Sequence, residues 1–491
     1  MAFLSGILKQ MTNLRFLKTT LLLAILLLSA CQRQKKVVEV NDPNEIDTYI
    51  ENLMKVHDVP GLALAVLKKD SVIHKKFYGK ASLEFDIPVD ENHLFRVYST
   101  TKLLVATAIF QLQEQGKLRL DDTLVIHLKN LPETWERVSI ANLLTHSSGI
   151  PNFIQFESHL NNEAVWAKLA ELPMEFEPGT LWRYNQTNYW LLAKIIEKQS
   201  GMTLTEFVAQ NQFEGDKDGF VFSSNSLEVI PNRISKYVFD DDLEKYEKSI
   251  DQEQSRGLAG NGLNITLDKF VSWNQRLDQN QILSNENKQK MWISQQFENG
   301  KRFAYGWDDY SFDDVKSFGF TGGGVSAFRK FVDHDITVIV LTNGYRYTPI
   351  HNTIVNEVVG IVDENLKNKS RSLQDAVFEA FIAKPFDKAL KTLDSVQKLY
   401  PDERFEGTLN RIGYTLLNKK ATKKAIDIFS LNTKKYPESS NTFDSLGEAF
   451  LVSGNLEAAL EQYQKALLLN PESTNAQKMI RGISRELKGS Q

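Results

Sequence analysis

The chain has 491 residues, which is too long for one compact core, so its length predicts at least two domains. Its composition, 42% hydrophobic and 24% charged, excludes wholesale disorder and a protein with many membrane spans. The formal net charge of -4 gives no reason to expect a nucleic-acid partner. The single cysteine, Cys31, excludes an internal disulfide, and the histidines lack metal-binding spacing. Neither a metal nor another cofactor is therefore expected.

Residues 1–30 have the composition of a secretion signal. Basic residues precede the aliphatic run from Leu21 to Leu28, which is too short to cross a bilayer as a helix. Ser29 and Ala30 then stand directly before Cys31. This pattern resembles the lipobox of bacterial lipoproteins, which implies cleavage before Cys31 and a lipid anchor on it, in the cell envelope outside the cytoplasm. A plain signal peptide with a chance cysteine is the alternative, and residues 31–44 are expected to be a tether.

Residues 45–365 are expected to form a domain of strands and helices. Strand-like runs occur in two pairs, 61–68 with 72–78 and 328–332 with 336–342. Residues 103–112 are apolar nearly all round and end before Gly116, which predicts a buried helix.

Ser99 and Lys102 stand at the start of that predicted helix, three residues apart and therefore on one face. A serine at the N-terminus of a helix lies at the positive end of the helix dipole, which favours an alkoxide as it forms. The Ser-x-x-Lys pattern alone is unspecific, because Ser395 and Lys398 match it in a segment where a solvated helix face explains them. The sequence around Ser99 is therefore needed to judge whether its Ser-x-x-Lys pattern indicates a nucleophile.

The segments around Ser99 supply that context. Four of them carry further motifs: Phe95–Tyr98, Gly116–Asp122, Leu143–Pro151 and Pro178–Tyr184. Together with Ser99 and Lys102 they resemble the serine β-lactamase and penicillin-binding-protein superfamily, especially its class C branch, which includes D,D-peptidases, D-aminopeptidases and esterases. The resemblance implies an α/β (α+β) fold, in which helices flank an antiparallel sheet and a helical subdomain is inserted.

The resemblance also implies roles for three motifs. Ser99 would be the acylated nucleophile of the first motif, with Lys102 beside it. The family's Tyr-x-Asn motif falls at Tyr184–Gln186, and Tyr184 would shuttle the serine proton. The Lys/His-Thr-Gly motif falls at Phe320, Thr321 and Gly322, and the backbone N–H groups of Ser99 and Gly323 would hold the oxyanion. A serine needs a neighbour that takes its proton, and burial can tune a lysine for that task.

Two positions depart from the family pattern. Gln186 replaces the usual Asn and adds one methylene, which is expected to displace its hydrogen bond. Phe320 replaces a Lys or His, and a phenyl ring cannot pair with a substrate carboxylate, a loss of about 1.5–3 kcal/mol. Phe320 therefore favours an ester or uncharged amide over a β-lactam or a D-Ala-D-Ala peptide. Arg329 could replace the missing charge, but a solvated strand residue is the expected reading.

Other polar and aromatic residues near these motifs are interpreted structurally. His146 is expected to bond neighbouring backbone rather than to act as a base. Trp182 and Tyr189 are expected to pack rather than to bind substrate. Asn261 and Gly262 resemble a family segment near the pocket, but no catalytic role is assigned to them.

The C-terminal residues 376–491 repeat with a period typical of tetratricopeptide repeats, after a Lys/Asn/Ser-rich stretch, 366–375, that is predicted to be a linker. Such repeats form an all-α solenoid, here with a polar capping helix over 474–487. They would bind a protein or peptide partner, or simply dock on the enzyme domain. The matching positions are Phe443, Leu446, Gly447, Phe450, Gly454, Ala459, Tyr463, Ala466 and Pro471, with earlier copies at Leu409, Ile412, Gly413, Leu416, Ala425, Phe429 and Pro437, and at Ala389, Leu393 and Pro401.

The sequence therefore predicts a lipid-anchored serine hydrolase. It would act through an acyl-enzyme on a small-molecule or peptide substrate, namely an ester, an amide or a D-amino-acid peptide. The alternative is a catalytically degenerate, penicillin-binding-like scaffold whose repeats bind a protein partner.

Overall fold

The computed structural model describes residues 43–489. The predicted signal peptide, the lipidation site Cys31 and the tether up to residue 42 lie outside the described residues. Helix α2 (Pro43–His57) includes the last two residues of the predicted tether, so the folded part begins slightly earlier than expected. Within residues 43–489, no helix is long and apolar enough to cross a membrane.

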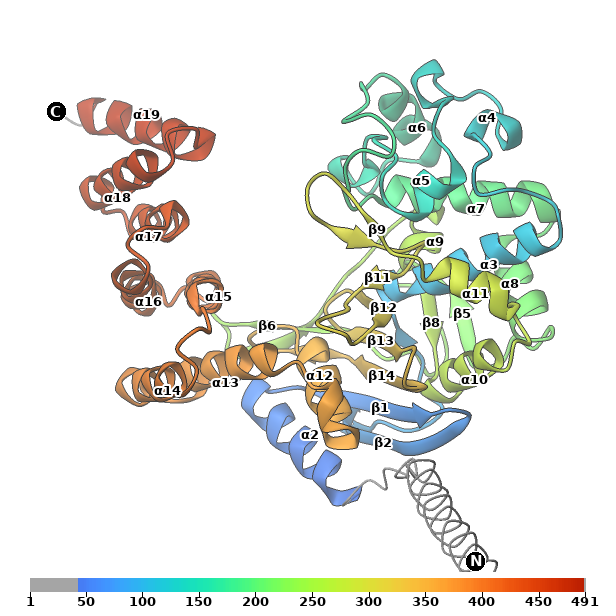
Figure 1. Ribbon diagram of the computed structural model, residues 1–491, viewed down its shortest axis with the longest axis horizontal. Helices are drawn as coiled ribbons and strands as arrows, with labels where there is room; N and C mark the ends of the chain where they lie inside the picture. Colours follow the sequence, from blue (N-terminus) through green and yellow to red (C-terminus); the bar gives the residue numbers. More distant parts are fainter. Residues whose placement is uncertain (1–42, 490–491) are drawn as a thin grey trace, which may run out of the picture. The chain divides into compact units, whose positions relative to one another are not determined.

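A nine-stranded antiparallel sheet forms the centre of the domain, in the order β3-β2-β1-β14-β13-β12-β11-β10-β9 (Figure 1). Both predicted strand pairs are present, and Lys69 makes the first turn with a positive φ of 55°. The strands are β1 (Gly61–Lys68), β2 (Ser71–Ser82), β3 (Ile87–Pro88), β9 (Gln295–Gln296), β10 (Arg302–Phe303), β11 (Asp308–Asp309), β12 (Ser317–Gly322), β13 (Ser326–Phe331) and β14 (Ile336–Thr342).

Two small three-stranded sheets accompany the large one. The first joins β4 (Phe95–Arg96), β8 (Leu263–Ile265) and β5 (Phe220–Phe222). Strand β4 directly precedes the Ser99 segment in the chain. The second joins β15 (Gly344–Tyr345), β6 (Tyr237–Asp240) and β7 (Lys245–Lys248).

Helices cover both faces of the large sheet, and each face has its own apolar core. On one face, α2 and α12 (His351–Val362) pack against the sheet with Leu64, Val338 and Phe331 between them. On the other face, Phe328 and Ile339 join a larger core that includes α3 (Lys102–Glu114) and α10 (Leu267–Asp278). The central strands are therefore buried on both sides.

Helix α3 is the buried helix that the sequence predicts, with every residue from Lys102 to Leu112 buried. Ser99 differs from the prediction, because it lies in a 3-10 turn, η1 (Tyr98–Thr101), that precedes α3. The helical subdomain over this face comprises α4 (Leu124–His127), α5 (Ile140–Leu144), α6 (Asn162–Ala170), α7 (Gln186–Ser200), α8 (Leu204–Gln212), α9 (Leu258–Asn261) and α11 (Asn285–Met291).

The C-terminal region is entirely helical within the described residues. Its helices α15 and α17 begin 34 residues apart, at 406 and 440, and so do α16 and α18, at 422 and 456. Gly413 lets two helices approach closely, since a Cβ atom there would lie 2.4 Å from the Phe429 ring. The helices are α13 (Lys369–Ala383), α14 (Phe386–Leu399), α15 (Glu406–Asn418), α16 (Thr422–Lys435), α17 (Ser440–Val452), α18 (Leu456–Leu469) and α19 (Thr474–Gly489).

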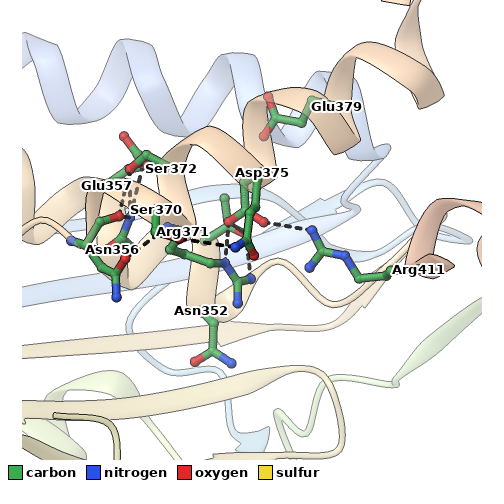
Figure 2. Close-up of polar contacts among 12 residues, drawn as sticks. Asn352, Asn356, Glu357, Ser370, Arg371, Ser372, Asp375, Glu379 and Arg411 are labelled. Carbon is green, nitrogen blue, oxygen red and sulfur yellow. Dashed lines mark hydrogen bonds and ion pairs between the residues drawn. The ribbon is translucent and has the colours of Figure 1, made fainter. Parts of the chain in front are cut away.

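The predicted linker at 366–375 is wrong, because most of this stretch is the first half of α13. Its polar residues make specific contacts that organise the helix. Asn368 caps the N-terminus of α13, and Ser372 bonds Glu357 on α12. Asp375 is buried and accepts hydrogen bonds from Thr353 on α12 and Arg371 (Figure 2). Helix α13 is therefore fastened to α12 of the domain that contains the large sheet.

Candidate active site

Ser99 is presented on a strained turn beside the end of β12. The preceding residue, Tyr98, has a φ of +46°, a conformation that bulky side chains rarely adopt. Thr101 braces the turn through its hydroxyl, which donates to the Tyr98 carbonyl and accepts from the Leu263 N–H. Strand β12 approaches so closely that a Cβ atom on Gly322 would lie 2.8 Å from the Ser99 nitrogen. Glycine is therefore required at 322.

Three polar groups converge on the Ser99 hydroxyl. The Tyr184 hydroxyl donates to Ser99 Oγ at 2.7 Å, and Ser99 Oγ donates to Asn261 Oδ1 at 3.1 Å. Lys102 Nζ lies 3.4 Å from Ser99 Oγ. The structure thus brings together the serine, lysine and tyrosine that the sequence singles out, from η1, α3 and the segment before α7.

Lys102 is buried among groups that cannot neutralise a positive charge. Its Nζ donates to Gln186 Oε1 and to the Gly260 carbonyl, both at 2.9 Å. Its surroundings are otherwise aromatic, with the rings of Tyr184, Tyr189 and Phe320 within 4.9–5.7 Å. Burial therefore lowers the pKa of Lys102 well below its usual value, against only a weak opposing effect of Glu253.

All three polar neighbours of Lys102 Nζ lie where they can accept a hydrogen bond from it. A neutral amine has two N–H donors and one lone pair, and the two acceptors at 2.9 Å engage both hydrogens. In that form the lone pair faces Ser99 Oγ, 3.4 Å away, which accepts the third N–H when the amine is protonated. The Ser99 proton is bonded to Asn261, and a rotation of the hydroxyl would bring it to the position where Lys102 can accept it.

Tyr184 is held in its protonated form. It precedes α7, whose N-cap Asn185 bonds the Thr187 N–H and the Ile150 carbonyl, so this segment has a fixed path. Burial raises the pKa of the Tyr184 phenol, and the hydrogen bond to Ser99 only partly opposes this shift. Tyr184 is therefore a proton donor toward Ser99 Oγ.

Asn261 and Glu253 belong to the site although the sequence reading assigned them no role. Gln186 Nε2 donates to Asn261 Oδ1 at 3.2 Å, while Asn261 Nδ2 donates to both carboxylate oxygens of Glu253. Glu253 thereby fixes the amide so that its oxygen faces Ser99. The resemblance of Ala259–Gly262 to a family segment was the available signal for Asn261, and none pointed to Glu253.

The third motif lines the site from β12. Phe320 is buried, with its ring 6.3 Å from the ring of Tyr184, so it forms an apolar wall and contributes to the desolvation of Lys102. Thr321 receives a long hydrogen bond of 3.5 Å from Tyr310. Gly323 has a φ of +55° and packs against the Tyr98 ring, where a Cβ atom would lie 2.5 Å from a ring carbon.

His146, Trp182 and Tyr189 surround Tyr184 rather than Ser99. Nδ1 of His146 accepts from the Asn185 N–H at 3.1 Å, and its ring centroid lies 4.5 Å from that of Tyr184. Burial and the nearby Lys102 lower the pKa of His146 well below its usual value, so the ring is neutral. Its backbone hydrogen bond agrees with the structural interpretation made from the sequence.

Arg329 does not take the place of the missing cation. In the β12–β13 ladder Phe320 is paired with Phe328, whereas Arg329 is paired with Gly319 and therefore points to the opposite face. It is not a solvated strand residue either, because only 6% of it is exposed. Both readings of Arg329 are therefore wrong.

The antiparallel sheet, its flanking helices and the inserted helical subdomain define the class of protein, an α/β domain with a β-lactamase-like fold. The chain belongs to the Beta-lactamase family, since the family model matches residues 46–354. A penicillin-binding protein of Bacillus subtilis (strain 168) is 28% identical over 376 residues, which cover 70% of this chain and 82% of that protein.

Solved structures share the fold. An octameric penicillin-binding protein homologue from Pyrococcus abyssi superimposes with a TM-score of 0.59 at 24% identity, covering 69% of this chain and 82% of that one. A D-amino acid amidase from Ochrobactrum anthropi SV3 superimposes with a TM-score of 0.57 at 19% identity, covering 66% of this chain and all of that one. The same fold is thus found in a penicillin-binding protein homologue and in a D-amino acid amidase.

Proposed function

We propose that this protein is a serine hydrolase that forms an acyl-enzyme on Ser99. One observation carries the proposal: Ser99 Oγ lies 2.7 Å from a protonated phenol, Tyr184, and 3.4 Å from a buried amine, Lys102. A hydroxyl between a base and an acid is the arrangement that nucleophilic catalysis requires. A catalytically degenerate scaffold has no need for a buried lysine whose pKa lies well below its usual value.

The proposed reaction uses these groups in turn. Lys102 takes the proton of Ser99 as Oγ bonds to the substrate carbonyl carbon, and the N–H groups of Ser99 and Gly323 bind the resulting oxyanion. The bond to the leaving group then breaks, and Tyr184 gives that group its phenolic proton. Lys102 returns the serine proton to Tyr184, and water releases the acyl group by the same steps in reverse.

The substrate we propose has no charge near its reacting carbonyl. Phe320 presents a phenyl ring where a substrate carboxylate would need a cation, the His146 ring is neutral because burial lowers its pKa, and burial also disfavours a charge on Lys102. An ester or an uncharged amide fits these surroundings better than an anionic β-lactam.

We also propose a lipid anchor at Cys31 and tetratricopeptide repeats in the C-terminal helices. The 34-residue offset between helix pairs and the close approach at Gly413 support the repeats. A protein or peptide partner for these helices, and a place in the cell envelope, complete the proposal.

The test is covalent labelling read by intact mass. The protein is treated with a fluorophosphonate and, separately, with a penicillin; the variants are Ser99→Ala and, as a matched control, Ser395→Ala on the exposed face of α14. A fluorophosphonate adduct on the wild type and Ser395→Ala but not on Ser99→Ala supports the hydrolase. A penicillin adduct would overturn the preference for uncharged substrates, and no adduct with either reagent would favour the scaffold.

A further inference from the structure

Arg329 has a buried guanidinium group for which the hydrolase site has no use. Its Nη2 donates to Asn352 Oδ1 at 2.9 Å and its guanidinium lies over the Tyr310 ring, but its Nε has no hydrogen-bond partner. Asp308 attracts it electrostatically, yet the carboxylate of Asp308 makes its ion pair with Lys301 at 2.7 Å. Burying a cation without a carboxylate partner costs folding free energy, and a bound ligand would offset this cost.

Arg329 lines a cavity of about 210 Å³ between β12, β13, α12 and the start of α13. Among the described residues that line this cavity, none is acidic. Besides Tyr310, the polar residues of its lining are two arginines, three asparagines and one serine: Arg329, Arg371, Asn352, Asn356, Asn368 and Ser317. Ser317 is also buried, and its hydroxyl has no partner. The lining is therefore rich in donors and positively charged.

Two helices begin at this cavity and add to its positive potential. Asn352 is the second residue of α12, and Asn368 is the N-cap of α13. The first turn of a helix carries unpaired N–H groups and the positive end of the helix dipole, which favour anions. Arg371, in the first turn of α13, is partly neutralised because its Nε donates to Asp375 at 2.7 Å (Figure 2). Arg329 has no such partner.

We propose that this cavity binds a small oxyanion, through a phosphate or carboxylate group held by Arg329, Arg371 and the Ser317 hydroxyl. The site lies on the face of the sheet opposite to Ser99, so it is separate from the proposed catalytic function. An anion there would join β13 of the hydrolase domain to α13 of the C-terminal helices. Burial lowers the pKa of Arg329 to about 10, so the side chain stays charged at neutral pH.

The experiment is titration calorimetry of the purified protein with inorganic phosphate and with acetate at constant ionic strength. Variants are Arg329→Gln and Arg371→Gln, with Arg404→Gln as the matched control, since Arg404 pairs with Glu406 and Glu438 outside the cavity. We expect saturable binding of one anion, tenfold or more weaker in Arg329→Gln, weaker in Arg371→Gln and unchanged in Arg404→Gln. Bound phosphate should also raise the thermal midpoint of the wild type by about 2 °C.

Three results would overturn the proposal. The first is no saturable binding of either anion, and the second is equal anion affinity of the wild type and Arg329→Gln. The third is an equal rise of the thermal midpoint with phosphate in these two proteins. If Arg329→Gln does not fold, the anion affinity of Arg371→Gln tests the proposal instead. The Arg371 side chain is one-third exposed, so the protein is expected to fold without it. Glycerol phosphate distinguishes the source of the anion. Tighter binding than inorganic phosphate indicates a phosphoryl group on a larger molecule, and weaker binding indicates the free ion.

Discussion

Gln186 and Lys102 are joined by a hydrogen bond of 2.9 Å between Oε1 and Nζ, and this bond is part of a closed ring. Gln186 Nε2 donates to Asn261 Oδ1, which also accepts from Ser99 Oγ, and Lys102 Nζ closes the ring at 3.4 Å from Ser99. A closed ring of four polar side chains fixes the position of each member. The Ser99 hydroxyl is therefore held in one position between Asn261 and Lys102.

The lowered pKa of Lys102 predicts how Ser99 reactivity depends on pH. Below this pKa the amine is protonated and cannot accept the serine proton; above it the amine is free. Labelling of Ser99 should therefore rise with pH and reach its plateau well below the ordinary lysine pKa. Rates measured from pH 4 to 10 check this, and a rise confined to the region near pH 10 would contradict it.

Replacement of the base gives the matching test. Lys102→Arg keeps a cation that cannot lose its proton in this pH range, so the labelling rate should fall by about 10²–10⁴ at every pH. Lys398→Arg, in the second Ser-x-x-Lys match on α14, is the control and should label as the wild type does.

Gly260 is predicted to be required for Ser99 reactivity because a side chain there would displace the Gln186 amide from Lys102. A Cβ atom there would lie 2.3 Å from Gln186 Oε1 and 3.4 Å from Lys102 Nζ. Gly260→Ala should push the Gln186 amide away from Lys102 and lower Ser99 labelling by tenfold or more. Gly407→Ala is the control, since nothing lies within 4 Å of a Cβ atom there. Equal labelling rates in the two variants would show that the ring of hydrogen bonds is dispensable.

The parts of the fold that the sequence predicted are those with a local signal. The buried helix α3 follows from a nearly continuous apolar run, and the strand pairs follow from their turns. Arg329 could not be placed in this way. Strand β13 is buried on both faces, so its residues lack the alternation that would show which way each side chain points. Its direction became clear only from its register with Gly319.

The linker and Asn261 were misread for a related reason. A polar composition at 366–375 predicted a linker, but Asn368, Ser372 and Asp375 use their polar groups to cap α13 and bind α12. The contact between Ser99 and Asn261 joins segments 162 residues apart and depends on tertiary packing. The polar composition of a segment shows that its side chains need hydrogen-bond partners, but only the tertiary structure shows whether those partners are water or other residues.

Asn261 is predicted to be a positioning residue for Ser99 and Gln186. Asn261→Ala removes the acceptor of both groups, so we expect kcat/KM to fall by about tenfold, equivalent to ~1.4 kcal/mol. Glu253→Gln removes the charge behind Asn261 but keeps an acceptor, and a smaller loss is expected. A purely structural role is excluded if Asn261→Ala keeps its thermal midpoint while losing activity; unchanged kcat/KM would contradict the assignment.

Phe320 is predicted to determine the preferred substrate charge. In Phe320→Lys the ammonium group would lie near the position now held by the ring, where it can pair with a substrate carboxylate. The ratio of kcat/KM for an anionic over an uncharged substrate should rise by about tenfold or more. Phe320→Leu keeps an apolar wall and should leave the ratio unchanged. An unaltered ratio in the lysine variant would mean that substrate charge is sensed elsewhere.

Asp375 is predicted to hold α13 against the β-lactamase-like domain. It is buried, and its carboxylate accepts from Thr353 at 2.7 Å, Arg371 at 2.7 Å and Arg411 at 2.9 Å (Figure 2). Asp375→Ala leaves these donors without an acceptor, so the free energy of unfolding should fall by about 2 kcal/mol. This is less than the loss expected when a fully buried ion pair is broken, because both arginines are one-third exposed to solvent. Urea unfolding measures the change, with the exposed Asp402→Ala as control. Ser99 labelling should persist in the folded variant, since the network lies outside the site. Equal stability of the two variants would mean that α13 is held by its apolar contacts alone.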